Sequence, residues 1–319
     1  MSDGSKIEWT DATWNVVIGC KKVSPGCDHC YAIRTAHRFQ EHPNPKVAAA
    51  YAGTEADGDW TGRVNMVEDR LSLPLQWKKP RRIFVNAQSD LFHADVTNEF
   101  IARVWAVMAL APQHTFQILT KRHGRMRSLL SSDRFEDLFA EALYSTEHPR
   151  GDEPAEPVGS APGPLPNVWI GVSVEDQARA DLRIPALLDT PAAVRWLSCE
   201  PLLGPVDLGM GSDMGAQDTL IDWVVVGGES GPGARPMHPD WARSLRDQCV
   251  AAGVPFLFKQ WGEHITPDQA PESFDMDYFD SGGRGYFRVG KKAAGREIDG
   301  RTWDEYPGVV VPMQRKASE

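Results

Sequence analysis

The stretch Cys20-Lys21-Lys22-Val23-Ser24-Pro25-Gly26-Cys27-Asp28-His29-Cys30-Tyr31 holds three of the five cysteines of the chain. The spacing is Cys-x6-Cys-x2-Cys, and an aromatic residue follows at once. A gap of two residues lets one tight turn aim two sulfurs at the same point, and the longer loop, with its proline and glycine, can bring the third sulfur there. Thiolates gathered in this way bind zinc or an iron–sulfur cluster. The stretch therefore predicts a metal centre at Cys20, Cys27 and Cys30.

The residues around this stretch leave the identity of the metal open. A zinc site of three cysteines and one histidine could use His29 or His37, although His29 lies between the two close cysteines and would point poorly at the same ion. Three thiolates on a four-iron cluster would instead leave one iron open to a substrate or cofactor. Cys249 lies inside an apolar helical pattern, where a buried structural thiol is expected.

Outside the cysteine stretch, apolar runs alternate with helical patterns. Strands are expected at Trp14–Ile18 and at residues 82–87, 115–120, 168–172, 194–198, 223–226 and 255–258. Helices are expected at residues 31–40, 97–110, 124–130, 134–144, 176–188 and 239–252. Continuous apolar strands are typical of a parallel sheet that is buried on both faces. The pattern predicts an α/β fold with a partial (β/α) barrel of about six to seven parallel strands, and a doubly wound sheet is the alternative.

The expected barrel occupies residues 1–262, with two insertions. Residues 41–81 and residues 145–166 are rich in proline, glycine and charge and show little periodicity. The first insertion is expected to hold at most a short helix. Residues 263–319 form a C-terminal extension that is expected to pack on the barrel, with a hairpin around Gly282-Gly283.

Polar residues and glycines follow most of the expected strands. Functional groups in (β/α) barrels come from the carboxyl ends of strands and from the loops after them. Strand ends are also polar because they meet solvent, which explains any single residue equally well but not the whole set together with the cysteines. The set consists of Asn86, Gln88, Ser89, Asp90, Thr120, Lys121, Arg122, Ser173, Glu175, Cys199, Glu200, Gly227, Gly228, Glu229, Ser230, Lys259 and Gln260.

Composition limits the classes of protein that the chain can belong to. The 319 residues are 41% hydrophobic and 24% charged, which suits one large globular domain. No run of eighteen apolar residues occurs, so no membrane span is expected. The first residues lack an apolar signal core, and clustered cysteines argue against a secreted disulfide scaffold. We therefore expect a cytoplasmic protein.

The net charge of −10 opposes a nucleic-acid partner, because phosphate would be repelled globally. Two basic clusters could overcome this locally, Lys78-Lys79-Pro80-Arg81-Arg82 and Lys121-Arg122-His123-Gly124-Arg125-Met126-Arg127. The alternative is that both are solvated strand and helix ends. If the second cluster surrounds the mouth of a barrel, it is expected to hold the phosphates of DNA, RNA or a nucleotide.

The three cysteines after a first strand, with an aromatic residue behind the last, resemble the cluster loop of radical S-adenosylmethionine (SAM) enzymes. The usual gap between the first two cysteines is three residues there and six here. The whole chain resembles the phage Gp37/Gp68 family, also called three-Cys-motif or DUF5131 proteins. The segments that carry this resemblance are residues 6–10, 13–15, 20–31, 89–93, 119–122, 171–175, 198–202, 227–231, 259–262 and 299–301.

The resemblance to radical SAM enzymes implies an open partial barrel, a [4Fe-4S] cluster on Cys20, Cys27 and Cys30, and SAM as a second cofactor. It implies reductive cleavage of SAM, with electrons from a donor such as flavodoxin or ferredoxin, and a nucleic-acid base or nucleotide is the substrate class considered. The alternative is a zinc-binding protein of a phage or its host that binds nucleic acid without catalysis. The residues expected to bind the cofactors are Ser89, Asp90, Ser173, Glu175, Gly227, Gly228 and Glu229, and those expected in catalysis are Lys121, Cys199 and Glu200.

Overall fold

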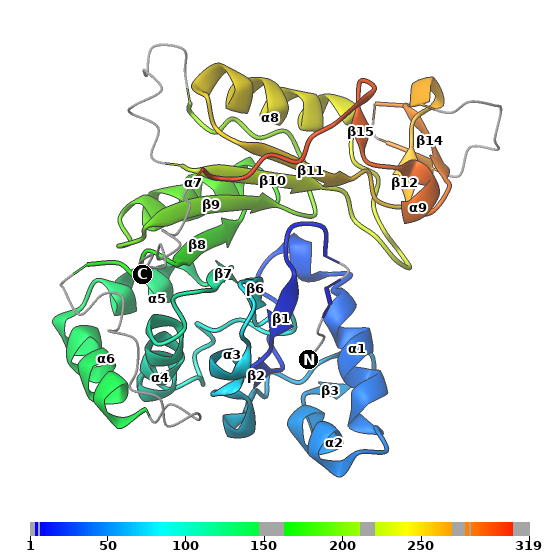
Figure 1. Ribbon diagram of the computed structural model, residues 1–319. Coiled ribbons are helices and arrows are strands. Elements are labelled where there is room, and N and C mark those ends of the chain that lie inside the picture. The colour runs from blue at the N-terminus through cyan, green and yellow to red at the C-terminus, as the bar shows by residue number, and fades with distance from the viewer. Residues whose placement is uncertain are drawn as a thin grey trace.

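Seven parallel strands follow one another across a single curled sheet (Figure 1). The computed structural model describes residues 4–5, 7–146, 163–210, 221–269, 278–280 and 282–308. Each strand lies beside its predecessor in the chain, so the order never reverses as it would in a doubly wound sheet. The result is a half-barrel, as predicted. Its strands are β1 (Ala12–Trp14), β6 (Arg82–Val85), β7 (Thr115–Thr120), β8 (Val168–Ser173), β9 (Val194–Cys199), β10 (Trp223–Gly227) and β11 (Phe256–Gln260).

The helices that connect these strands begin and end close to the predicted residues. Side-chain caps explain four of the starts: for example, Thr97 accepts a hydrogen bond from the backbone of Phe100, and Asp176 accepts one from Arg179. Gly253, with φ of 68°, ends α8 in the left-handed conformation that glycine favours. The helices are α1 (Tyr31–Gln40), α4 (Asn98–Ala109), α5 (His123–Leu130), α6 (Asp133–Ser145), α7 (Gln177–Leu188) and α8 (Pro239–Ala252).

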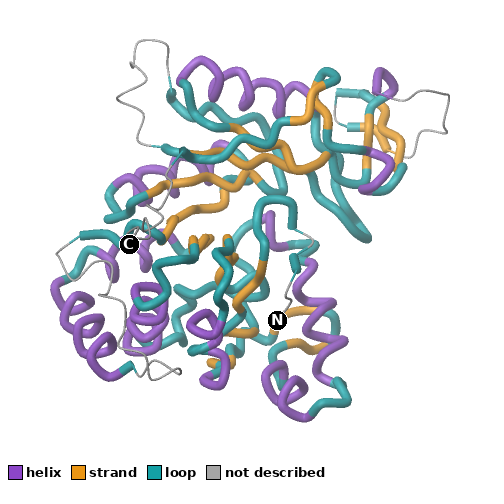
Figure 2. The backbone as a smooth tube through the Cα atoms, in the orientation of Figure 1, coloured by secondary structure: helices purple, strands orange, loops and turns teal. Residues whose placement is uncertain are grey.

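Both faces of the sheet are buried, which explains why the strands are apolar throughout. The helices cover the outer face (Figure 2), where side chains such as Val224 and Val226 of β10 join the main core. The inner face is covered by an aromatic cluster, which we call the inner aromatic cluster. It contains Trp9, Phe84, Trp169, Val194, Trp196, Trp223, Val225 and Leu257.

The predicted first strand, Trp14–Ile18, is wrong in its position. The sheet strand β1 ends at Trp14, and β2 (Val17–Ile18) pairs instead with β5 (Asn65–Met66) in a separate antiparallel pair. The apolar run extends past the sheet because Ile18 packs in a small core under the first insertion. That insertion holds more structure than the one short helix expected: α2 (Pro45–Tyr51), β3 (Glu55–Ala56), β4 (Asp59–Trp60), β5 and α3 (Leu73–Gln76).

The chain after β11 lies against the half-barrel. The Trp223 indole donates a hydrogen bond to the carbonyl of Glu305 at 2.8 Å, and the Phe258 amide donates one to the carbonyl of Trp303 at 3.0 Å. The predicted hairpin is present as β13 (Tyr278–Phe279) and β14 (Gly285–Arg288). The remaining elements are β12 (His264–Ile265), α9 (Lys291–Ala294), β15 (Glu297–Ile298) and β16 (Arg301–Thr302).

Most of the second predicted insertion, residues 147–162, lies outside the described part of the chain. Among the helices that are described, none combines the length and the apolar character needed to cross a bilayer.

Close packing inside the half-barrel depends on the absence of a side chain at Gly171. A Cβ atom at this position would lie 2.4 Å from the indole ring of Trp196. We expect Gly171→Ala to destabilise the protein by about 1–3 kcal/mol, because the buried ring cannot move away freely. In urea unfolding, Trp196→Phe should cost less in the Gly171→Ala background than in the wild type.

Gly204→Ala is the matched control, since a Cβ atom there would meet its nearest neighbour at an ordinary 3.6 Å. Equal effects of the two alanine substitutions would contradict the packing argument.

Candidate functional site

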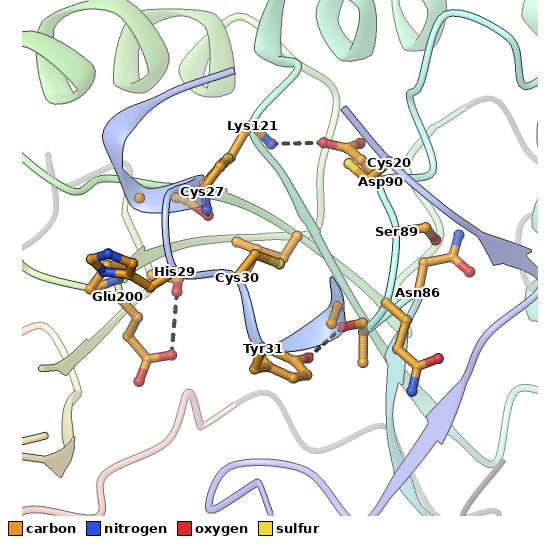
Figure 3. A pocket seen from close by; sticks show the side chains of 18 of the residues that line it. Cys20, Cys27, His29, Cys30, Tyr31, Asn86, Ser89, Asp90, Lys121 and Glu200 are labelled. Carbon is orange, nitrogen blue, oxygen red and sulfur yellow. Dashed lines mark hydrogen bonds between the residues drawn. The ribbon is translucent and has the colours of Figure 1, made fainter. Parts of the chain in front are cut away.

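A cavity of about 270 Å³ lies at the carboxyl ends of the parallel strands, and the cysteine loop (residues 20–30) borders it. Figure 3 shows the three cysteines around this cavity together with polar side chains from the strand ends. Most of the predicted site residues line it. These are Cys20, Cys27, Cys30, Ser89, Asp90, Lys121, Ser173, Glu200, Gly228 and Glu229.

All three loop cysteines are free, half-buried thiols. Cys27 closes a short 3-10 turn (Pro25–Cys27), and Cys30 is the N-terminal cap of α1. Burial, with the nearby charge of Asp90, raises the pKa of Cys20 to about 12. Burial also raises the pKa of Cys30. Both thiols therefore hold their protons in the metal-free protein, and a bound metal must displace them.

The three sulfurs do not converge on one point. Within the described residues, no three histidine, cysteine or acidic side chains are arranged to hold a single metal ion. Zinc needs four ligands around one ion, whereas the thiolates of a four-iron cluster bind different irons. Each histidine considered for zinc bonds through Nδ1 to a carboxylate, His37 to Glu55 at 2.9 Å and His29 to Glu229 at 3.0 Å, which leaves Nε2 as the nitrogen that could bind a metal.

The fully buried carboxylate of Glu175 fixes one side of the cysteine loop. It accepts a hydrogen bond from Ser24 Oγ at 2.6 Å and pairs with Arg183 at 2.8 Å and with Lys121 at 3.4 Å. A Cβ atom at Gly26 would lie 2.5 Å from the same carboxylate, so glycine is what lets the loop approach this closely.

Burial by itself would raise the pKa of Glu175. The charges of Lys121 and Arg183 and the hydrogen bond from Ser24 outweigh that effect, and the pKa lies below its usual value. The carboxyl group is therefore ionised at neutral pH, although Glu175 itself does not line the cavity.

Arg235 fixes the other side of the loop. Its guanidinium pairs with Glu229 at 2.7 Å and with Asp28 at 3.1 Å, and it donates to the carbonyl of Pro25 at 2.8 Å. Glu229 also forms a hydrogen bond with His29. Residues after β10 therefore contact the loop at both ends of its short 3-10 turn. The Gly-Gly-Glu segment after β10 therefore positions the cysteine loop in this structure.

The side chains after β6 are occupied by contacts within the protein. Asp90 accepts hydrogen bonds from Thr120 Oγ1 and from the backbone of Phe92 and Lys121. Ser89 Oγ donates to the carbonyl of Val17 at 2.7 Å. Both residues line the cavity, and Ser89 Oγ keeps its acceptor lone pairs because it acts only as a donor to Val17.

Of the three predicted catalytic residues, Lys121 and Glu200 line the cavity and Cys199 does not. Neighbouring residues of a strand point to opposite faces. Ser198 and Glu200 face the cavity, so the completely buried Cys199 faces the helices and joins the outer core. Its position gives no support to a catalytic role. Glu200 pairs with Lys259 from β11 at 3.3 Å.

The basic side chains at residues 121–127, which were expected to hold phosphates, form hydrogen bonds and ion pairs with other groups of the protein. Lys121 bonds to Ser173 and Glu175, and Arg122 donates to the carbonyl of Lys21. The other two members, Arg125 and Arg127, contact the His93 carbonyl and Asp189 respectively. The cluster at residues 78–82 precedes β6, at the end of the sheet opposite the cavity. Of the four lysine and arginine residues of the cluster at residues 121–127, Lys121 lines the cavity, whereas Arg122, Arg125 and Arg127 do not.

Sequence reasoning missed Ser24, Arg183 and Arg235. Arg183 could have been identified from the sequence, because it lies on the buried face of α7 together with Ala180 and Ala186. A lone arginine on such a face needs a buried partner of opposite charge. Arg235 lies in an irregular segment, where no periodicity points to its partner.

Fold and site together define a (β/α) half-barrel protein with a three-cysteine loop over the cavity at its strand ends. The family model described as "Protein of unknown function (DUF5131)" matches residues 4–307. The chain belongs to this family. No curated protein and no solved structure matches the chain.

Removal of the Glu175 charge should weaken the fold and the loop together. Glu175→Gln leaves Arg183 buried beside a neutral amide, and we expect a loss of about 3–5 kcal/mol in the free energy of unfolding. Glu136→Gln, on the exposed surface of α6, is the matched control and should stay within about 0.5 kcal/mol of the wild type. An equally small effect at Glu175 would show that the carboxylate does not hold the loop.

The same carboxylate predicts a pH dependence. Because its pKa is lowered in the folded protein, the stabilisation is present above the unfolded pKa of about 4.3 and is lost as the pH falls through the lower folded value. The difference in unfolding free energy between wild type and Glu175→Gln should therefore shrink below about pH 4.3. A difference that stays constant from neutral pH to pH 3 would contradict this assignment.

Proposed function

We propose that this protein is a radical SAM enzyme that holds a [4Fe-4S] cluster on Cys20, Cys27 and Cys30. The observation that carries the proposal is that one short loop brings three free thiols to a single cavity at the carboxyl ends of a parallel half-barrel. This is the edge of such folds where catalytic groups gather.

The donor set fits a four-iron cluster. Three thiolates would leave one iron without a protein ligand, where a cofactor or substrate can bind. When bound, the cluster would supply an electron for the cleavage of SAM to methionine and a 5′-deoxyadenosyl radical, with a protein such as flavodoxin or ferredoxin as electron donor.

The residues of the chain would bind and orient the cofactors and would exclude water from the cavity. Glu175 and Arg235 hold the cysteine loop from two sides, so the directions of the thiols are set before a metal arrives. Ser173, Gly228 and Glu229 line the cavity and would contact SAM, whereas Glu175 and Gly227 are not among the lining residues and would act through their neighbours. Lys121 places a cation between Ser173 and Glu175, and it can hold a negative charge that develops on a bound molecule.

Metal content and turnover test this proposal. After anaerobic reconstitution with iron and sulfide, the wild type should bind iron, show the broad visible absorbance of a cluster, and form 5′-deoxyadenosine from SAM with a reductant. Each of Cys20→Ala, Cys27→Ala and Cys30→Ala should lose the cluster, because two thiolates hold it poorly.

Cys249→Ala is the matched control, because this thiol is buried in α8 away from the cavity, and it should keep its iron. Stoichiometric zinc without iron in the wild type would instead establish the zinc-binding alternative. Iron binding without any 5′-deoxyadenosine would refute the SAM reaction while leaving the cluster assignment intact.

A further inference from the structure

The inner part of the cavity, which we call the floor, combines apolar rings with two carboxamide groups. Its residues are Trp9, Phe84, Asn86, Leu119 and Gln260, and all of them line the cavity. The Trp9 and Phe84 rings are in contact, with centroids 4.6 Å apart, and belong to the inner aromatic cluster. Asn86 and Gln260 are only 3% and 5% exposed, so neither side chain can rely on bulk water.

The orientation of each carboxamide is fixed by the backbone. Asn86 Oδ1 accepts hydrogen bonds from the amides of Val16 and Val17, both at 3.0 Å, which leaves Nδ2 as its free group. Gln260 Nε2 donates to the carbonyl of Gly228 at 2.8 Å, which leaves Oε1 free. Asn86 Nδ2 and Gln260 Oε1 have no hydrogen-bond partner among the described residues. The indole Nε1 of Trp9 also has no hydrogen-bond partner among the described residues, so the floor presents two buried donors, Asn86 Nδ2 and Trp9 Nε1, and one buried acceptor, Gln260 Oε1.

Unpaired buried polar groups are unusual and unfavourable. Most such groups in folded proteins have a partner, and each unpaired one destabilises the protein measurably. Three unpaired groups on one floor, two of them oriented by hydrogen bonds to the backbone, indicate a ligand that completes their hydrogen bonds. The free groups are neutral, and Glu200, a charged residue that lines the same cavity, is already paired with Lys259. The ligand that fits the floor is therefore a neutral polar molecule and not an ion.

We propose that the floor binds a neutral heteroaromatic ring of nucleobase type, with an acceptor that meets Asn86 Nδ2 and a donor that meets Gln260 Oε1. The faces of such a ring are apolar enough to lie against Trp9 and Phe84, while its edge carries the required donor and acceptor. The cavity of about 270 Å³ lies just below the range of about 300–1,000 Å³ that is usual for small-molecule sites, which suits a ligand as small as a single ring system. This inference rests on the proposed function for the location of the reaction, but ring binding itself needs neither cluster nor turnover.

Asn86→Asp tests the donor selectively. Aspartate keeps an oxygen for the amides of Val16 and Val17 and tolerates the positive φ of 60° at this position, but it replaces the free N–H group with an acceptor. The probes are adenosine, guanosine, cytidine, uridine and, as a blank, ribose, titrated into the purified full chain by calorimetry and tryptophan fluorescence. We expect at least one nucleoside to bind the wild type, ribose not to bind, and Asn86→Asp to weaken binding at least tenfold.

Asn44→Asp is the matched control. Asn44 Oδ1 also accepts a backbone hydrogen bond, from Lys46, but the residue is exposed and far from the lining of the cavity, so nucleoside affinity should not change. If Asn86→Asp fails to fold, as judged by circular dichroism, Gln260→Met tests the acceptor, which lies at the end of β11. It too should lower affinity about tenfold, as expected for one lost hydrogen bond.

Competition with SAM distinguishes the two sources of the ring. Displacement of the nucleoside by SAM would show that the floor takes the adenosyl group of the cofactor, and simultaneous binding would show that it takes a substrate base. Nucleoside binding without cluster formation would support the floor and refute the proposed function. The proposal is overturned if none of the four nucleosides binds at millimolar concentration, or if Asn86→Asp binds as tightly as the wild type.

Discussion

The position of the cysteine loop depends on one buried carboxylate. Glu175, at the carboxyl end of β8, meets Ser24 from the loop, Lys121 from the end of β7 and Arg183 from α7. A buried charge with only one partner would be unfavourable, so the loop, the sheet and the helix are each needed to satisfy the others. These shared contacts join residues far apart in the chain at one end of the sheet, and they hold the loop that carries Cys20, Cys27 and Cys30.

The fold was largely predictable because its signals are local. The bounds of α1 and α8 follow from helical periodicity and from Gly253, and six of the seven sheet strands follow from apolar runs. The misplaced first strand shows the limit of that signal. Ile18 is apolar because the insertion buries it, and an apolar run alone does not say which neighbour does so.

The candidate site was predictable in its outline but not in its contacts. The cysteines and the polar strand ends do gather at one cavity, since parallel strands place their carboxyl ends together. Strand alternation could have separated Cys199 from Ser198 and Glu200, because alternate residues face opposite sides. The partners of Lys121 and Arg235 could not be predicted from the sequence, because they depend on tertiary distances that residue spacing does not encode.

The inner face of the half-barrel is closed by segments from distant parts of the chain. Trp9 packs against Trp196 and Trp223, and Tyr306 packs on Trp223 and bonds to the carbonyl of Glu8, 298 residues away in sequence. Contacts of such long range form slowly and only after the intervening chain exists. On the ribosome, the aromatic interior must therefore stay incomplete until the last of these residues has emerged, and the nascent half-barrel exposes tryptophan-rich surface that a chaperone can recognise.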